Sequence, residues 1–130
     1  MEEHPDKKSR SYEDLIVWQK SIALTKDIYT ITSSFRDTER YGLISQMRRA
    51  AIFISSNIAE GQRRNTKKDF VYFLHIAYGS AAELKTEMII AHTLDYVDSE
   101  RVSHMKELIE EIERILNTFI STLKRREASH

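Results

Sequence analysis

Apolar residues recur every three or four positions in four segments of the chain, the spacing that places them on one face of an α-helix. In residues 11–32 this pattern consists of Leu15, Trp18, Ile22, Ile28, Tyr29 and Ile31. In residues 37–61 it consists of Leu43, Ile44, Met47, Ala50, Ala51, Ile54 and Ile58. Each of these segments therefore predicts a helix that buries one stripe of side chains against a shared core.

The third and fourth segments carry longer stripes of the same kind. From Thr66 onward the third contributes Phe70, Phe73, Leu74, Ala77, Ala81, Leu84, Met88 and Ala91. From Ser99 to Arg126 the fourth contributes Val102, Met105, Leu108, Ile109, Ile112, Leu116, Phe119, Ile120 and Leu123. No stretch alternates with the period of two that a half-buried β-strand requires. The chain is therefore expected to be all-α.

Polar residues with capping chemistry precede three of the segments. Ser11 is expected to be the N-cap of the first helix, with Asp14 at the capping-box position. Thr66 and Asp69 repeat this arrangement before the third helix. Asp37 is expected to cap the second helix, because its side chain can accept a hydrogen bond from the first turn.

The chain has only three glycines, and two of them stand at informative positions. Gly61 is expected to end the second helix in the left-handed conformation that glycine adopts freely. Asn57 and Glu60 just before it are expected to fix that helix end through hydrogen bonds. Gly79 lies within the third helix and costs about 1 kcal/mol of helix propensity. We expect another helix backbone to approach closely there in compensation.

Short connections between long helices favour antiparallel neighbours. The sequence therefore predicts one domain over residues 11–126, an antiparallel up-down-up-down four-helix bundle. Residues 1–10 and 127–130 are expected to be polar tails outside it. The chain has no cysteine, no apolar leader and no membrane-spanning stretch, a combination that favours the cytoplasm and no membrane association.

No constellation of residues predicts catalysis. The dimetal site of ferritin-like bundles needs a glutamate three positions before a histidine on two helices. Tyr72, Ile89 and Arg101 occupy that position before the three histidines within the helices. Glu83 and Glu87 lie one turn apart, but pairing with a basic residue of a neighbouring helix is the commoner role of such carboxylates. We therefore expect no enzymatic activity, no metal ion and no cofactor.

Positive charge is concentrated between Arg36 and Lys68, where eight basic and three acidic residues give a local net charge of +5. The formal net charge of the whole chain is zero. Within this stretch, four cations surround the start of the third helix, where the helix dipole disfavours them: Arg63, Arg64, Lys67 and Lys68. They are candidates for binding nucleic-acid phosphates, with an ordinary solvated basic loop as the alternative.

Arg48 and Arg49 lie mid-helix beside the apolar stripe of the second segment. One interpretation is that they also contact phosphates. The other, which we favour, is that they pair with Glu60, Glu83 or Glu87 and orient the helices, because a partly buried arginine generally needs a carboxylate.

The most specific sequence signature is YGLISQMRRA at residues 41–50, followed by SNIAEG at residues 56–61. Together with DLIVWQK at 14–20, FVYFLHIAYGS at 70–80 and AELKTE at 82–87, it resembles a bacterial family of four-helix bundles. These are the proteins encoded in intervening sequences of 23S rRNA genes. The same family is similar to the accessory variability determinant of diversity-generating retroelements.

This resemblance implies an antiparallel four-helix bundle that assembles as a homopentamer and has no known enzymatic activity. The retroelement relatives bind nucleic acid and a reverse transcriptase through basic surfaces, so RNA, DNA and a reverse transcriptase become expected partners. The chain departs from the family pattern at Arg36, where proline is common, and at Phe53 and Ser55, where serine and proline are common. Phe53 lies off the main stripe and is expected at a subunit contact.

Aromatic residues support self-association. Trp18, Phe53, Tyr72 and Tyr78, with Phe119, offer more aromatic surface than one thin bundle readily buries. Tyr72 and Tyr78 are also candidates for stacking on bases. The leading hypothesis is a homo-oligomeric nucleic-acid-binding or ribonucleoprotein accessory factor that uses the basic surface between its second and third helices. Zero net charge and an acidic fourth helix support the alternative, an oligomeric protein–protein adaptor that binds no nucleic acid.

Overall fold

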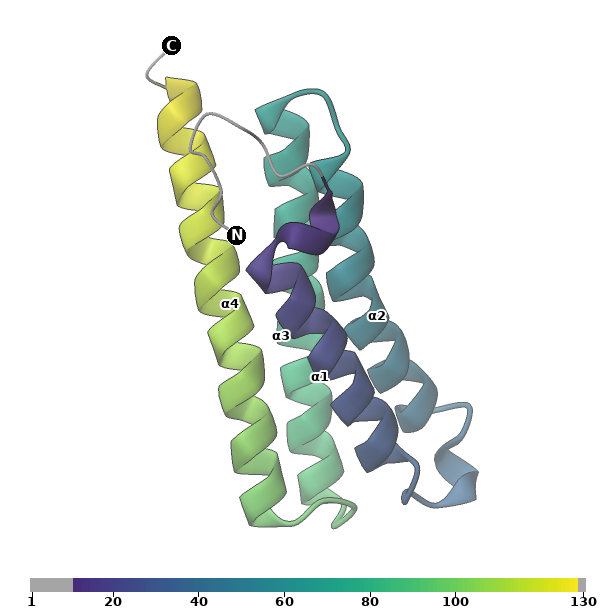
Figure 1. Cartoon of the computed structure of the whole chain (residues 1–130). Coiled ribbons are helices and arrows are strands. Elements are labelled where there is room, and N and C mark those ends of the chain that lie inside the picture. The colour runs from purple at the N-terminus through teal and green to yellow at the C-terminus, as the bar shows by residue number, and fades with distance from the viewer. Residues whose placement is uncertain (1–10, 129–130) are drawn as a thin grey trace.

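Four long helices run in alternating directions and form the bundle (Figure 1). The structure is a computed structural model that describes residues 11–128, with side chains up to residue 126. Its helices in chain order are η1 (Tyr12–Asp14), α1 (Ile16–Thr32), η2 (Asp37–Glu39), α2 (Leu43–Gln62), α3 (Lys67–Thr93) and α4 (Ser99–Ala128), where η denotes a 3-10 helix. The predicted up-down-up-down bundle is confirmed. The predicted tail at residues 1–10 lies outside the described residues, and α4 continues two residues past the predicted boundary.

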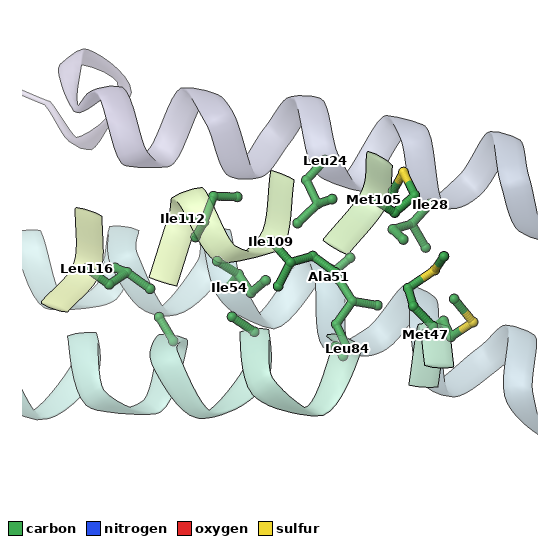
Figure 2. Close-up of a cluster of buried hydrophobic side chains, with 14 of the residues drawn as sticks. Leu24, Ile28, Met47, Ala51, Ile54, Leu84, Met105, Ile109, Ile112 and Leu116 are labelled. Carbon is green, nitrogen blue, oxygen red and sulfur yellow. The ribbon is translucent and has the colours of Figure 1, made fainter. Parts of the chain in front are cut away.

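All four helices contribute to one hydrophobic core (Figure 2). Its largest fully buried members include Leu24 and Ile28 of α1, Ile54 of α2, Leu84 of α3 and Ile109 of α4. Burying a leucine or isoleucine stabilises the fold by about 1.5–3 kcal/mol relative to leaving it exposed. The stripes predicted for α2, α3 and α4 all lie on the buried side of their helices, with Leu43, Ile44, Phe73, Leu108 and Phe119 half-buried at its margins.

The buried face of α1 differs from the predicted one. The predicted Ile28 and Ile31 are buried, but Val17 and Leu24 are buried with them, whereas the predicted Ile22 and Tyr29 are 43% and 41% exposed. The helix has apolar residues on two faces, so its sequence period alone does not select one. The buried face includes Ser21. Its hydroxyl keeps a hydrogen-bond partner, because it donates to the Trp18 carbonyl at 2.7 Å.

Two of the predicted N-caps belong to the 3-10 helices η1 and η2, which precede α1 and α2. The hydroxyl oxygen of Ser11 accepts from the Glu13 N–H at 3.1 Å and caps η1, after which extended Leu15 separates η1 from α1. Asp37 likewise begins η2 rather than α2. Both helices are therefore shorter at their N-terminal ends than predicted. The third prediction is confirmed, since the Asp69 N–H donates to the Thr66 hydroxyl at 3.1 Å.

Neither of the two informative glycines has its predicted role. No described glycine has a positive φ, and Gly61 lies inside α2, so the predicted left-handed helix end is wrong. A Cβ on Gly61 would instead lie 2.9 Å from atoms of Phe70 and Phe73, because α2 and α3 approach closely at this point. Gly79 is exposed, and a Cβ there would have no atom within 4 Å. The close approach predicted at Gly79 therefore occurs at Gly61.

The end of the bundle that holds the α1–α2 and α3–α4 connections is fixed by side chains. Phe35 stacks on Tyr96 with ring centroids 5.0 Å apart, and the Tyr96 hydroxyl donates to Glu39 at 2.9 Å. This hydrogen bond raises the pKa of Tyr96. Asp95 adopts a left-handed conformation with φ of 66° where the chain leaves α3. Over residues 11–128, no helix is long and apolar enough to cross a membrane.

Candidate nucleic-acid interface

The opposite end of the bundle is basic. Arg63 and Arg64 follow α2 directly, and Lys67 and Lys68 form the start of α3. The turn between them is short because the Arg64 N–H donates back to the Gly61 carbonyl at 3.1 Å and Thr66 caps the next helix. Arg63, Arg64 and Lys68 are exposed, and Lys67 is half-buried. The structure thus brings together the four cations predicted from the sequence.

The C-terminal turns of α4 lie at this same end (Figure 1). The first turn of α3 packs beside them, with the Phe70 and Phe119 rings 5.1 Å apart in an edge-on contact. Beyond Phe119, α4 carries exposed Lys124 and Arg125, followed by Arg126. These three cations were not predicted from the sequence to be part of the site. In an antiparallel pair, residues equally distant from the connecting turn lie side by side, and that rule would have found them.

We call these residues the basic end: Arg63, Arg64, Lys67, Lys68, Lys124, Arg125 and Arg126. Arg64 forms an ion pair with Glu60 at 2.7 Å, and its guanidinium lies 4.8 Å from the centroid of the Phe73 ring. Both side chains of that ion pair are nearly half exposed, so it adds little stability. Arg63 and Lys68 have no ion pair among the described residues, and their charges face solvent.

Arg48 and Arg49 do not belong to this surface. The Arg48 guanidinium donates to the Thr32 hydroxyl at 2.9 Å and lies 4.3 Å from the Tyr29 ring centroid. It thereby places a cation at the negative end of α1, where positive charge is favourable. Arg49 lies 5.1 Å from the Phe53 ring centroid. The predicted pairing of these arginines with Glu60, Glu83 or Glu87 is wrong, because within residues 11–126 neither pairs with a carboxylate.

Glu83 and Glu87 have no cationic partner in the described part of the chain. Glu87 is only 5% exposed, and its Oε1 has no hydrogen-bond partner there. Burial raises the pKa of Glu87 to about 7, and the charge and hydrogen bonding of Glu83 add to that effect. An isolated buried carboxylate is costly, so the neutral acid is favoured. The pair therefore holds a proton close to neutral pH, and its predicted ion pairing is wrong.

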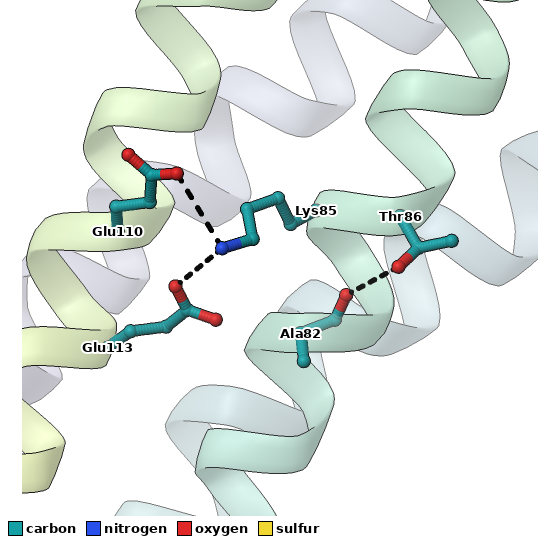
Figure 3. Close-up of polar contacts among 5 residues, drawn as sticks. All are labelled: Ala82, Lys85, Thr86, Glu110 and Glu113. Atoms are coloured by element: carbon teal, nitrogen blue, oxygen red, sulfur yellow. Dashed lines mark hydrogen bonds and ion pairs between the residues drawn. The ribbon is translucent and has the colours of Figure 1, made fainter.

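Three carboxylates of α4 are paired within the chain instead. The Lys85 ammonium lies 3.0 Å from Glu113 and 3.6 Å from Glu110 and joins α3 to α4 (Figure 3). The hydrogen bond from Lys85 to Glu113 raises the pKa of Lys85. Lys20 of α1 pairs with Glu111 at 3.2 Å. The acidic fourth helix, which had suggested an adaptor surface, thus uses part of its charge to hold its neighbours.

The four aromatic residues predicted at a subunit contact divide into two groups. Trp18 and Tyr78 are half-buried against the core of their own chain, and Trp18 also meets Tyr12 edge-on at 5.2 Å. Phe53 and Tyr72 are 40% and 60% exposed. The Asn57 side chain forms a hydrogen bond within α2, in which its amide donates to the Phe53 carbonyl at 2.8 Å.

Between residues 11 and 126, no three His, Asp or Glu side chains gather closely enough to hold a metal ion.

The fold and the basic end define an antiparallel four-helix bundle with a cationic pole. A family model described as 23S rRNA-intervening sequence protein matches residues 13–118, and the chain belongs to that family. It is also similar to a solved structure from Bacteroides thetaiotaomicron, a protein of unknown function from the S23 ribosomal protein family. The two share 21% identity and a TM-score of 0.75, over 82% of this chain and 96% of that one, a likeness that shows the fold. No curated protein matches this chain.

Proposed function

We propose that the protein is a non-enzymatic, homo-oligomeric accessory factor that binds nucleic acid through its basic end. The observation that carries this proposal is the convergence of cations from the α2–α3 turn and from the end of α4 on one pole of the bundle. Glu60 at the end of α2 is already paired with Arg64, and Asp69 is the one acidic residue in the first turn of α3. The pole therefore presents concentrated positive charge on a chain whose formal net charge is zero.

The physical benefit of phosphate binding is specific to this position. Cations in the first turn of a helix are disfavoured by about 0.3–1 kcal/mol each, and they repel one another across the turn. A phosphate group relieves both costs and also gains from the free N–H groups at the start of α3. Neutralising phosphates releases their condensed counterions, which drives binding at low salt.

Self-association is the second part of the proposal. Several large apolar side chains of α2, of α3 and of the C-cap of α3 are at least 40% exposed, a degree of exposure typical of association surfaces: Ile52, Phe53, Ile89, Ile90 and Leu94. The family resemblance suggests five copies. Light scattering at micromolar concentration tests this part, and a mass of 15.3 kDa, that of one chain, would contradict it.

The basic end is tested by a salt series with two variants of equal charge. In the first, Arg63, Arg64, Lys67 and Lys68 are all replaced by glutamine. In the matched control, four exposed cations of the opposite half are replaced by glutamine: Lys26, Arg36, Arg40 and Arg101. Binding of RNA and DNA oligonucleotides is then measured by anisotropy between low and physiological salt.

We expect the first variant to reduce the slope of log Kd against log salt by as much as about 3, because each lost phosphate contact removes about 0.7–0.9. The control should keep most of the slope. Equal losses in the two variants, or no binding by the unchanged protein at low salt, would overturn the proposal.

A protein–protein adaptor is the second candidate function, favoured by the same exposed apolar side chains of α2 and α3. It predicts that partner proteins remain bound to the chain after nuclease treatment and are lost when Phe53 is replaced by a charged residue.

A further inference from the structure

One exposed ridge of α3 leads away from the basic end and carries residues suited to a nucleotide. Lys68, Tyr72, His75 and Gly79 follow one another at intervals of three or four positions and are all exposed. Residues at this spacing are neighbours on a helix surface. The ridge therefore presents a cation, an aromatic ring, an imidazole and a bare stretch of backbone in a line.

The ring of Tyr72 is unusually open for its position. It is 60% exposed and stands one helical turn beyond Lys68 of the basic end. Its ring meets the Phe73 ring edge-on at a centroid distance of 5.2 Å, and the Arg64 guanidinium lies over Phe73 in turn. This chain of contacts joins Tyr72 to the basic turn, so that the ring and the cations form one surface.

The residues that follow leave room for a flat ligand. His75 offers a second ring that can stack on a base. Gly79 has no atom within 4 Å of where a Cβ would lie, so nothing projects from the ridge at that point. The helix backbone fixes the spacing of these residues before a ligand arrives, which lowers the entropic cost of binding.

We propose that this ridge binds unpaired nucleotides, with a base stacked on Tyr72 and its phosphate bound by Lys68. The ligand class is therefore single-stranded nucleic acid, or an unpaired segment of a folded one, rather than a continuous duplex. The inference rests on the proposed function and specifies its ligand. Bases inside a duplex stack on one another and offer no free face, whereas an unpaired base can stack on an aromatic side chain.

Tyr41 provides a matched control. It is 89% exposed, more than Tyr72, but lies in the connection between η2 and α2 at the other end of the bundle. The variants are Tyr72→Ala, Tyr72→Phe and Tyr41→Ala in the full chain. The probes are a single-stranded oligonucleotide containing 2-aminopurine, the same oligonucleotide with abasic sites, and a blunt duplex of equal length. Circular dichroism and light scattering establish that each variant keeps its fold and its mass.

We expect Tyr72→Ala to weaken binding of the single strand about five- to hundredfold, with an unchanged salt slope because no charge is lost. Tyr72→Phe keeps the ring and should stay within about twofold of the unchanged protein, as should Tyr41→Ala. The fluorescence of 2-aminopurine should be quenched by the unchanged protein and not by Tyr72→Ala. Abasic sites should weaken binding to the unchanged protein and have little effect on Tyr72→Ala.

Three results would overturn the inference while leaving the proposed function standing. In the first, Tyr72→Ala and Tyr41→Ala weaken binding of the single strand equally. In the second, the unchanged protein binds the abasic strand as tightly as the strand with all its bases. In the third, Tyr72→Ala lowers the mass of the oligomer and weakens binding of the single strand and the duplex equally. The last would assign Tyr72 to a subunit contact. Failure of the unchanged protein to bind any probe would instead overturn the proposed function, and this inference with it.

Discussion

The two long interfaces of α3 are built on opposite principles. Towards α4, Lys85 reaches two carboxylates, and the interface is bridged by charge. Towards α2, the helices come so close that Gly61 leaves no room for a methyl group beside Phe73. Farther along α3, Glu87 is buried and has no counter-ion among the described residues. The comparison teaches that one helix can join a neighbour through an ion pair and still bury another carboxylate, whose pKa is raised by burial.

The pH dependence of stability gives the largest expected effect. The native pKa of Glu87, about 7, lies above the value of 4.5 for an unperturbed glutamate. The native state therefore holds more protons than the unfolded state between these values, and the free energy of unfolding falls as pH rises through this range. The loss should be about 3 kcal/mol by pH 8, since one pKa unit corresponds to about 1.4 kcal/mol.

Urea unfolding at pH 5 and pH 8 measures this loss. Glu87→Gln mimics the neutral acid and should abolish most of the dependence, so that the variant is the more stable protein at pH 8. Glu113→Gln serves as the control, because that carboxylate is paired with Lys85. A pH profile unchanged by Glu87→Gln would contradict a raised pKa of Glu87 and its contrast with the paired Glu113.

The close approach at Gly61 is tested with a second glycine as its control. Gly61→Ala should destabilise the bundle by about 1–3 kcal/mol, because the new methyl group would meet Phe70 and Phe73 at 2.9 Å and force α2 and α3 apart. Gly79→Ala has open space and should stabilise α3 by up to about 1 kcal/mol. Thermal unfolding compares the two. Stabilisation by both substitutions would show that helix propensity, and not the spacing of α2 and α3, governs them.

The charged interface should respond to loss of its cation. Lys85→Met leaves Glu113, whose side chain is 12% exposed, beside Glu110 without a counter-ion, and we expect a loss of about 1–2 kcal/mol at pH 7. The double variant Lys85→Met with Glu113→Leu should recover most of that loss, because replacing both partners leaves no buried charge. Denaturant midpoints measure both effects. If the double variant is no more stable than Lys85→Met, then the unpaired charge of Glu113 is not the cause of the loss.

Much of the candidate site could be predicted because its signals are local. Arg63, Arg64, Lys67 and Lys68 are close in sequence, so their clustering needs no knowledge of the fold. Lys124 and Arg125 were missed because they join the site only through the antiparallel packing of α3 and α4. The partner of Arg48 was also mispredicted, since the helix end that it contacts carries no charged side chain to signal it.

The sequence by itself determined that the chain folds into four antiparallel helices, because helical period and short connections are properties of neighbouring residues. It also determined which family the chain resembles, through motifs that are continuous in sequence. Only the tertiary structure decided which face of α1 is buried, where two helices touch at a glycine, and that Glu87 has no counter-ion within residues 11–126. These outcomes depend on how helices distant in sequence rotate and approach one another, and no local pattern records that geometry.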